Sequence, residues 1–249
     1  MTLDLKGLEE LAMWSQWQEV VKNSLPNFCA DRIYVEQLSP SQEEFEAVAE
    51  YVAHNLMDSE GKTRDAAYGG IIRNTKALGE VTRMWLDANI EIDFLTRHMP
   101  CWENARVLEI GAGYGRLAVM LEFFVKEYYC IDAVPISTEL CKMYCAAHGN
   151  QVQVLELSDL AEMDESSAIN LAINIHSFNE CNLVQIARWL DILWEMRVPW
   201  LFTVSHPDSQ AYLSYDLKSW KELILNYYDL VAEEFIGLGK CPHALWKRK

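Results

Sequence analysis

Three glycines at alternate positions carry the strongest chemical signal in this sequence. An apolar run with the letters VLEI is followed by Gly111, Gly113 and Gly115. Glycine lets the backbone turn sharply and lets a ligand lie against it, and a helix that follows presents oriented N–H groups. A dehydrogenase-type GxGxxG would need glycine where Arg116 stands, and Glu109 would repel a pyrophosphate but suit an amino group. The segment therefore predicts a ligand-binding loop, and the alternative is an ordinary strand-to-helix turn.

Two further acidic residues follow the next two predicted strands. Asp132 stands 23 positions after Glu109, a spacing at which a carboxylate accepts hydrogen bonds from both hydroxyls of a ribose. Asp159 follows the third predicted strand and is able to bind an adenine amino group. Its alternative role is the N-cap of a short helix. We therefore expect Asp132 in the ligand site and leave both roles of Asp159 open.

A cluster of polar side chains, with the letters HSFNE, follows the fourth predicted strand. The carboxyl end of a strand beside the ligand loop is where an open α/β sheet places its active site. An imidazole there can remove a hydroxyl proton, and His176 is our first choice for that base, with Glu180 orienting it or binding the acceptor. Alternatively, His176 only contacts the ligand or caps the next helix. His206, after the fifth strand, is the rival base, and His243 is a weaker third.

A glycine-containing segment of the N-terminal region is expected to face the same site. Tyr68 precedes two adjacent glycines, which are typical of a turn, and Arg73 and Asn74 follow them. The guanidinium of Arg73 can bind a carboxylate of the ligand or of an anionic acceptor in a bidentate manner. The alternative is a surface loop in which Arg73 pairs with one of the many acidic residues. We expect Tyr68, Arg73 and Asn74 to contact the substrate.

Alternating strands and helices from residue 105 onward are expected to position these side chains. The predicted strands cover residues 106–110, 128–132, 152–157, 170–175, 200–204, 230–236 and 244–247. The predicted helices cover residues 115–126, 137–148, a short stretch near 160, 183–196 and 217–228. This alternation predicts an α/β fold with a mostly parallel sheet covered on both faces, and the last two strands are expected to form a hairpin.

Residues 1–99 are expected to form a helical region that covers the ligand site. Ser41 and Glu44 have the spacing of a capping box at the start of a helix. Steps of three and four predict a second helix through Leu78, Val81, Trp85, Ala88, Ile92 and Leu95. We therefore divide the chain into an N-terminal helical cap, residues 1–99, and a ligand-binding domain, residues 100–249.

Composition limits the partners and the location that we expect. The 249 residues hold 37 acidic and 21 basic side chains, a formal net charge of −16, which disfavours nucleic acid as a partner. The seven cysteines are scattered, and Cys141 and Cys145 have no second ligand pair, so we expect reduced thiols, a cytoplasmic protein and no metal. The first residues lack a signal-peptide pattern, and no apolar run reaches about 18 residues, so no membrane contact is expected.

Glu109 before a GxGxG loop, Asp132 after the second strand, and seven strands ending in a hairpin together resemble the class I S-adenosylmethionine-dependent methyltransferases. The resemblance covers residues from about 100 to 249. It implies a Rossmann-like sheet with strand order 3-2-1-4-5-7-6, the last strand antiparallel, and S-adenosylmethionine as cofactor. The cofactor contacts expected on this basis are Glu109, Gly111, Ala112, Gly113, Gly115, Asp132, Ala133, Asp159 and Asn174.

The run after the fourth strand is also similar to bacterial families assigned as sugar O-methyltransferases. The Asn-Pro-Pro-Tyr motif used on nucleobase and glutamine amino groups is absent, because Asn174 is followed by Ile175 and His176. The paired acids of metal-dependent catechol-type enzymes are not evident, since Asp208 has no matching partner. We therefore expect methyl transfer to a hydroxyl of a sugar or a related small metabolite. The alternatives are methylation of an amine or of a phosphorus-linked oxygen, and a non-catalytic partner subunit; the oligomeric state is open, with a homodimer as one option.

Overall fold

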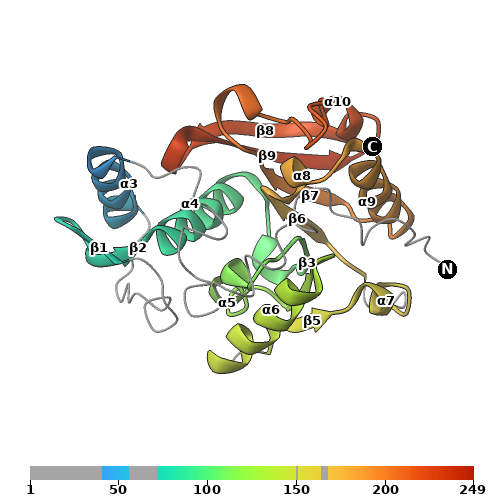
Figure 1. The fold of residues 1–249 in the computed structure, drawn as a ribbon, viewed down its shortest axis with the longest axis horizontal. Helices are drawn as coiled ribbons and strands as arrows, with labels where there is room; N and C mark the ends of the chain where they lie inside the picture. The colour runs from blue at the N-terminus through green and yellow to red at the C-terminus, as the bar shows by residue number, and fades with distance from the viewer. Residues whose placement is uncertain (1–40, 56–71, 150, 164–167) are drawn as a thin grey trace.

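A seven-stranded sheet forms the centre of the molecule (Figure 1). The structure is a computed structural model, and it describes residues 41–55, 72–149, 151–163 and 168–249. The four central strands are β3 (Arg106–Ile110), β4 (Glu127–Ile131), β6 (Leu171–Ile175) and β7 (Trp200–Val204). Almost every residue of these strands is buried, because helices cover both faces of the sheet.

The strand order is β5-β4-β3-β6-β7-β9-β8. Strands β3 to β7, including β5 (Gln153–Leu155), pair with one another in parallel. Strand β9 (Cys241–Arg248) runs antiparallel both to β7 and to β8 (Tyr228–Ile236). The predicted order 3-2-1-4-5-7-6 and the C-terminal hairpin are therefore confirmed. Because the order reverses between β3 and β6, the loops that follow these two strands border one crevice.

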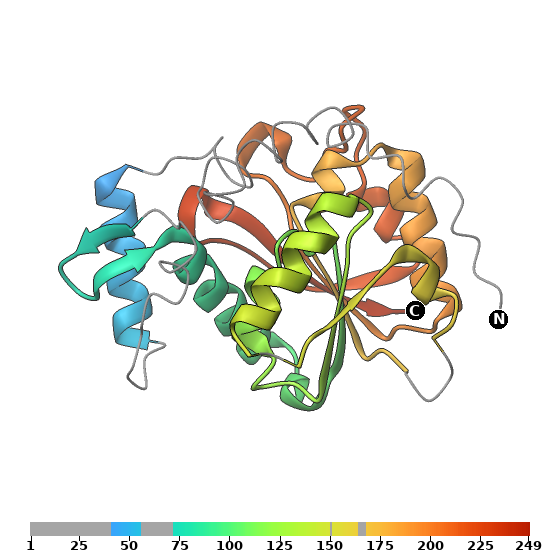
Figure 2. The same cartoon turned by 60° about the horizontal axis from the view of Figure 1, so that its bottom comes forward.

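Helices of very different length connect the strands. Figure 2 shows α6 crossing in front of the sheet. Helix α9 begins with a capping box, in which Asn182 and Gln185 exchange hydrogen bonds. The α-helices of this part are α5 (Arg116–Leu121), α6 (Pro135–Ala147), α7 (Leu157–Leu160), α8 (Ser177–Glu180), α9 (Leu183–Glu195) and α10 (Lys221–Ile224). Short 3-10 turns are η4 (Trp102–Asn104), η6 (Asp208–Gln210) and η7 (Leu238–Lys240).

The described part of the N-terminal region consists of two helices and a hairpin. Helix α3 (Gln42–Asn55) and the hairpin of β1 (Ile72–Thr75) and β2 (Gly79–Thr82) lie together at one end of the molecule, beyond α4 (Arg83–His98). One face of α4 packs into the main core through Met84, Ala88, Phe94 and Leu95. Another face forms a second core with α3, through Trp85, Leu86, Ile90, Phe45, Ala49 and Val52.

Two predicted helices are wrong in their extent. The apolar steps from Leu78 do not belong to one helix, because Leu78 and Val81 lie in the β1–β2 hairpin. Helix α4 begins only after Thr82, whose side chain accepts a hydrogen bond from the N–H of Trp85. The helix predicted over 217–228 is reduced to α10, since an irregular turn precedes it and β8 already starts at Tyr228. An apolar pattern with a period of 3.6 is produced here by a hairpin and a helix together, and its side chains are divided between the two cores.

Smaller differences concern the ends of other elements. The strand predicted over 152–157 is shorter, because Leu157 starts α7. The helix predicted over 115–126 ends at Leu121. At Ser41 the predicted cap is present, since its hydroxyl accepts a hydrogen bond from the N–H of Glu44, whereas the Glu44 carboxylate reaches Gly239 instead. Within the described ranges, no helix combines the length and the apolar character that crossing a membrane requires.

Candidate functional site

The glycine loop connects β3 to α5, and its three glycines adopt backbone angles that glycine favours. Gly111, Gly113 and Gly115 have φ values of +73°, +57° and +89°. The N–H groups of Gly111 and Ala112 both donate to the carbonyl oxygen of Ile131, at 2.8 and 3.3 Å. The loop is therefore fixed to the end of the neighbouring strand β4 by the protein's own backbone.

Two of these glycines are also required by neighbouring side chains. A Cβ atom at Gly111 would lie 2.2 Å from the Oγ atom of Ser177. A Cβ atom at Gly115 would lie 2.8 Å from Cys141 Sγ and 2.9 Å from Cys145 Sγ. The sequence explained these glycines by the space that a ligand needs. At Gly111 and Gly115 this explanation is incomplete, because side chains of the protein itself occupy the space next to the glycine.

Asp132 follows β4, and its carboxylate fastens the loop from the other side. Its Oδ2 accepts a hydrogen bond from the N–H of Gly113 at 3.0 Å, and Oδ1 accepts one from the N–H of Val134 at 2.8 Å. Burial raises the pKa of Asp132 to about 6, although both N–H donors act to lower it. Because a carboxylate has about four lone-pair directions, both oxygens can still accept hydrogen bonds from a ligand.

Glu109 lies below the loop, near the carboxyl end of β3, and is almost fully buried. The hydroxyl of Tyr128 donates to Glu109 Oε2 at 2.9 Å. Burial raises the pKa of Glu109 to about 8, against the charge of Arg116 and the hydrogen bond from Tyr128, which lower it. The group is therefore only partly ionised near neutral pH, whereas the sequence suggested a fully charged carboxylate beside the loop.

His176 directly follows β6 and has an unusual environment. Its φ is +61°, in the left-handed region, and it occupies the N-cap position of α8, although its side chain forms no capping hydrogen bond. The Nδ1 atom is buried and has no hydrogen-bond partner among the described residues. The pKa of His176 lies well below its usual value. Burial is the largest cause, and the nearby His206 and Arg116 lower the pKa further. The imidazole is therefore neutral at neutral pH and able to accept a proton.

Asn179 fixes the rival histidine beside His176. Its Oδ1 accepts hydrogen bonds from Ser205 Oγ at 3.2 Å and from the N–H of His206 at 3.1 Å, and its Nδ2 donates to two backbone carbonyls. The rings of His176 and His206 lie with their centroids 5.2 Å apart. His206 Nδ1 is 3.3 Å from Gln210 Oε1, and burial lowers the pKa of His206. The structure thus brings both candidate bases together.

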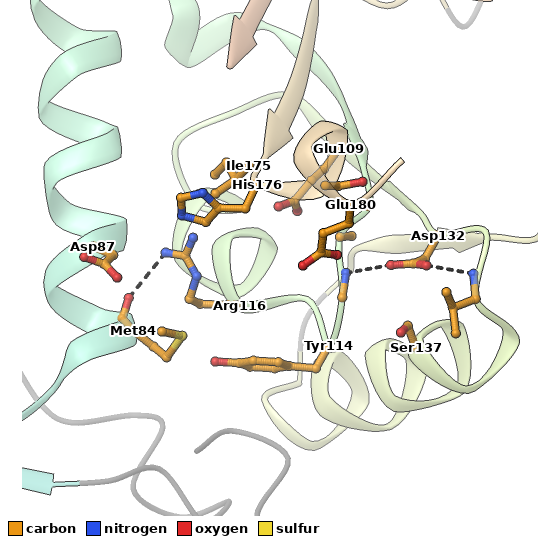
Figure 3. Close-up of a pocket in the computed structure, with 15 residues that line it drawn as sticks. Met84, Asp87, Glu109, Tyr114, Arg116, Asp132, Ser137, Ile175, His176 and Glu180 are labelled. Carbon is orange, nitrogen blue, oxygen red and sulfur yellow. Dashed lines mark hydrogen bonds between the residues drawn. The ribbon is translucent and has the colours of Figure 1, made fainter. Parts of the chain in front are cut away.

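A cavity opens between the glycine loop, α4 and the connection from β6 to α8 (Figure 3). Figure 3 shows His176 and Glu180 entering it from one side, Asp132 from another, and Met84 and Asp87 from α4. Of the expected residues, those lining this cofactor-side cavity are Glu109, Gly111, Ala112, Gly113, Asp132, His176 and Glu180. The residues that sequence reasoning missed are Met84, Asp87, Tyr114, Arg116, Val134, Ser137, Ile175 and Ser177.

A second, smaller and polar cavity lies on the other side of His176. This polar chamber is lined by charged or titratable side chains from three segments, namely Arg83, Asp87, Glu91, His176 and His243. His243 Nδ1 lies 2.9 Å from the carbonyl oxygen of Cys241 and donates to it, which leaves Nε2 as a hydrogen-bond acceptor. Burial lowers the pKa of His243 to about 4. Asp87 and His176 line both cavities, so the two spaces meet at these side chains.

Arg116 joins the glycine loop to α4. Its guanidinium forms a bidentate ion pair with Glu91, with N–O distances of 2.8 and 2.9 Å, and its Nη1 also donates to the carbonyl of Met84 at 3.3 Å. Both side chains of the pair are largely buried. The signal in the sequence is an acidic residue between two isoleucines of an apolar helix, since a buried carboxylate needs a cationic partner.

Comparisons with known proteins support the topology. No protein-family model matches the sequence, and the search of curated proteins found no match. Among solved structures, a Pyrococcus horikoshii OT3 protein superposes with a TM-score of 0.51 and 13% identity over 64% of this chain and 87% of the other. A SAM dependent methyltransferase from Aquifex aeolicus has a TM-score of 0.50 and 17% identity over 64% and 89%. The methyltransferase domain of bacterial CtHen1-CN has a TM-score of 0.50 and 12% identity over 65% and 97%.

This chain has the Rossmann-like methyltransferase fold. Within that fold, several expected cofactor residues stand behind the cavity wall. Asn174 Nδ2 donates to the carbonyl of Ile110 at 3.0 Å, and its Oδ1 accepts from the N–H of Phe178 at 3.0 Å, so its amide connects two loops. Gly115 and Ala133 belong to the same loops but do not line the cofactor-side cavity.

The other expected residues lie elsewhere in the methyltransferase fold. Asp159 is not the N-cap of α7 but its third residue, where it takes part in a capping box with the N-cap Glu156, since its Oδ2 accepts a hydrogen bond from the N–H of Glu156 at 2.8 Å. Arg73 and Asn74 lie in strand β1 rather than in a loop, and neither lines the two cavities. The guanidinium of Arg73 lies over the ring of Phe45, 4.9 Å from its centroid. Tyr68 lies outside the described residues.

The described residues of this fold contain no group of three or more His, Cys, Asp or Glu side chains arranged to hold a metal ion. Cys141 and Cys145, the pair one helical turn apart, are free thiols with their sulfur atoms 4.0 Å apart. Both pack beneath Gly115, so in this structure they have a packing role.

Proposed function

We propose that this chain is an S-adenosylmethionine-dependent methyltransferase that acts on a hydroxyl group of a small polar acceptor, a sugar or a related metabolite. One observation carries the proposal. The glycine loop with its Asp132 carboxylate shares a cavity with His176, a neutral histidine whose Nδ1 atom has no partner among the described residues. This cavity therefore combines a place for a nucleoside-containing cofactor with a proton acceptor.

The residues around the loop suit this cofactor. Asp132 can accept hydrogen bonds from the ribose hydroxyls, since its two oxygens each use only one direction for the backbone. The backbone of Gly111 to Gly113 and the side chain of Ser137 line the same space, and Glu109 offers an acceptor for an amino group. When bound there, the cofactor supplies a methyl group on a positively charged sulfur. Positioning is then the main task of the protein.

His176 is proposed as the general base. A sugar-like hydroxyl has a pKa far above neutrality, so its proton has to be removed as the new C–O bond forms. Nδ1 of the neutral imidazole accepts this proton, which converts His176 into an imidazolium. Glu180, which lines the same cavity, is proposed to bind the acceptor or to orient the imidazole. His206 remains the rival base, although Gln210 is near its Nδ1 atom.

An amine is a second candidate acceptor. Asp87 and Glu180 both line the cofactor-side cavity and present carboxylate groups there, which can accept hydrogen bonds from the N–H groups of an amine. For an amine that arrives unprotonated, the base matters less, so replacing His176 would have little effect on turnover. The size of that effect therefore separates the two acceptors.

Cofactor binding is the first test. Calorimetric titration with S-adenosylhomocysteine should give a dissociation constant in the micromolar range for the full chain, and Asp132→Asn should weaken it about tenfold or more, because one charge-assisted contact to the ribose is reduced. Asp159→Asn is the matched control, since that carboxylate caps α7 and does not line the cavity. Absence of binding would favour the non-catalytic partner subunit.

The acceptor requires a separate screen. Incubation of the full chain with labelled methyl donor and a panel of sugars, sugar nucleotides and amino compounds should transfer label to a hydroxylated member. Net charge supports a small molecule over nucleic acid as the partner. The cytoplasmic location, the division at residues 99 and 100 and the possible homodimer stay predictions.

A further inference from the structure

Among the described residues that line the cofactor-side cavity, Arg116 is the only lysine or arginine. Figure 3 shows its guanidinium between His176 and Met84. The carboxylate side chains that line the same cavity are Asp87, Glu109, Asp132 and Glu180. Since these carboxylates repel a negatively charged ligand group, such a group has to be bound at the guanidinium of Arg116.

The guanidinium of Arg116 has N–H groups that the protein does not use. Of its five N–H donors, Nη1 donates to Glu91 Oε2 at 2.9 Å and to the carbonyl oxygen of Met84 at 3.3 Å, and Nη2 donates to Glu91 Oε1 at 2.8 Å. The Nε–H group and the second N–H of Nη2 have no acceptor among the described residues. These two N–H groups lie on one edge of the planar guanidinium, which can bind a carboxylate in a bidentate manner.

Neighbouring carboxylates fix this edge without occupying it. The side chain of Glu91 is 3% exposed, and both of its oxygens are bound by the opposite end of the guanidinium. Asp87 is bound by Arg83, whose Nε lies 3.2 Å from Asp87 Oδ2, so it does not take the edge. A group that the protein already holds in one orientation loses little conformational entropy when a ligand binds. The edge of Arg116 is therefore prepared for a ligand.

Glu109 offers the complementary partner in the same cavity. The hydroxyl of Tyr128 donates to its Oε2 at 2.9 Å, and the thiol of Cys130 lies 4.0 Å from the same oxygen. Oε1 accepts no hydrogen bond from the described residues, so it is an acceptor for a ligand. Burial raises the pKa of Glu109, and the nearby charge of Arg116 is the largest influence in the opposite direction. A positive and a negative group of one ligand can therefore be bound together here.

We infer that Arg116 binds the α-carboxylate of an amino-acid group of the ligand through its Nε–H and Nη2–H edge, while Glu109 accepts a hydrogen bond from the α-ammonium. This inference rests on the proposed function, in which the amino-acid group belongs to S-adenosylmethionine. The sequence suggested Arg73 for a carboxylate, but Arg73 lies over Phe45 and does not line the cavity. The same charges disfavour nucleoside diphosphates and triphosphates, because several negative charges would meet one guanidinium among four carboxylates.

Calorimetric titration of the full chain with two ligands tests the contact. S-adenosylhomocysteine carries the α-carboxylate, and its decarboxylated analogue lacks only that group. The measured quantity is the ratio of the two dissociation constants, because an unfolded fraction of a variant affects both titrations alike. In Arg116→Gln, the preference for S-adenosylhomocysteine over the analogue should fall at least about tenfold relative to the wild type, since a hydrogen-bonded contact between two charged groups is lost.

Two further variants distinguish a direct contact from a general effect of charge or of folding. Arg116→Lys keeps the positive charge beside Glu91 but replaces the planar fork with a point charge, so the preference should fall about fivefold or more. Glu91→Gln disturbs the same buried pair and keeps the guanidinium. It should retain or increase the preference, because the edge of Arg116 is still present and a competing carboxylate has been removed.

An unchanged preference in Arg116→Gln would overturn this inference. So would a full preference in Arg116→Lys, which would show that charge alone is sufficient, and an equal loss in Glu91→Gln, which would show that the effect comes from the structure of the pair. If neither ligand bound the wild type, the proposed function would fall, and this inference with it. Binding of both ligands with an unchanged ratio would overturn the inference alone, so the two failures are distinguishable.

Discussion

The two sides of the candidate site are built in different ways. The glycine-loop side is formed by residues 109–134, and the hydrogen bonds within it join positions about twenty residues apart, such as Gly113 and Asp132. The opposite side, beyond His176, brings together α3, α4 and the β8–β9 turn, where Glu44 contacts Gly239 across 195 positions of sequence. The glycine loop is thus formed by a local motif, whereas the opposite side is a surface that only the complete fold assembles.

His176 stands where the two sides meet, and replacing it should have the largest effect. His176→Asn keeps a residue type that tolerates a positive φ but removes the base. We expect kcat to fall by about 10²- to 10⁴-fold, the usual contribution of a general base. Affinity for S-adenosylhomocysteine, measured by calorimetry, should change by less than about twofold, because the substitution leaves the glycine loop and Asp132 unchanged.

The pH profile sharpens the same test. Because burial holds the pKa of His176 well below its usual value, the wild-type kcat should persist on the acid side of the usual histidine pKa and fall only as the pH passes below the depressed value. A larger loss of kcat in His206→Asn than in His176→Asn would show that His206, and not His176, is the base.

The buried ion pair between the two sides should have the largest effect on stability. Arg116→Leu leaves the Glu91 carboxylate buried without its partner, and we expect the free energy of unfolding to drop by about 3 to 5 kcal/mol in denaturant titrations. Arg97→Leu is the matched control on the partly exposed pair with Glu234, where about 1 kcal/mol or less is expected. Equal losses would show that burial does not distinguish these pairs.

Within the glycine loop, the contact between Gly111 and Ser177 should be the next in size. Gly111→Ala introduces both the strain of a positive φ and a Cβ 2.2 Å from Ser177 Oγ, so we expect a loss of about 3 kcal/mol in the free energy of unfolding. Gly79→Ala is the matched control, because Gly79 has a φ of +72° and no atom within 4 Å of the added Cβ. It should lose only about 1 kcal/mol, from strain alone.

The effect of Glu109 on stability should be visible only as a dependence on pH. Burial raises its folded-state pKa from 4.5 to about 8, so the folded protein binds a proton more tightly than the unfolded chain. This contribution to stability is complete below pH 4.5 and is lost as the pH rises through about 8. Unfolding measured between pH 6 and 9 should therefore show a decline in the wild type that Glu109→Gln reduces.

Glu127 is a control, because its pKa is shifted in the opposite direction to that of Glu109. A hydrogen bond from Tyr129 is the main cause that lowers the pKa of Glu127, so its contribution is present at neutral pH and is lost only as the pH falls into the acid range. Glu127→Gln should leave the slope between pH 6 and 9 unchanged. If both variants had the same slope, the burial of Glu109 would not explain the pH dependence.

The sheet was largely predictable because its signals are local. Buried parallel strands need continuous apolar runs, and those around Leu108, Tyr129 and Ile173 gave their positions to within about two residues. The prediction failed where periodicity was ambiguous. Leu78 and Val81 continue the apolar pattern of α4, and only the pairing of β1 with β2 separates them from that helix.

The site was also predictable where its residues lie in local sequence signals. The residues expected from strand ends that the structure brings to one cavity are Glu109, Gly111, Gly113, Asp132, His176 and Glu180. Asp87 and Met84 were missed, because their place depends on how α4 packs on the sheet. Arg73 and Asn74 were expected at the site and lie in β1 instead, since two neighbouring glycines do not reveal how the hairpin pairs.

The sequence by itself determined the α/β class and the residues of the glycine-loop side, because these depend on patterns a few residues long. The strand order was expected only from the resemblance to class I methyltransferases. Only the tertiary structure decided that Gly111 accommodates Ser177, that Arg116 holds Glu91, and that His176 lies between two cavities. Burial, the pKa of a side chain and the shape of a cavity are produced by neighbours far away along the chain. They arise when α3, α4 and the β8–β9 turn meet, and no short segment contains that information.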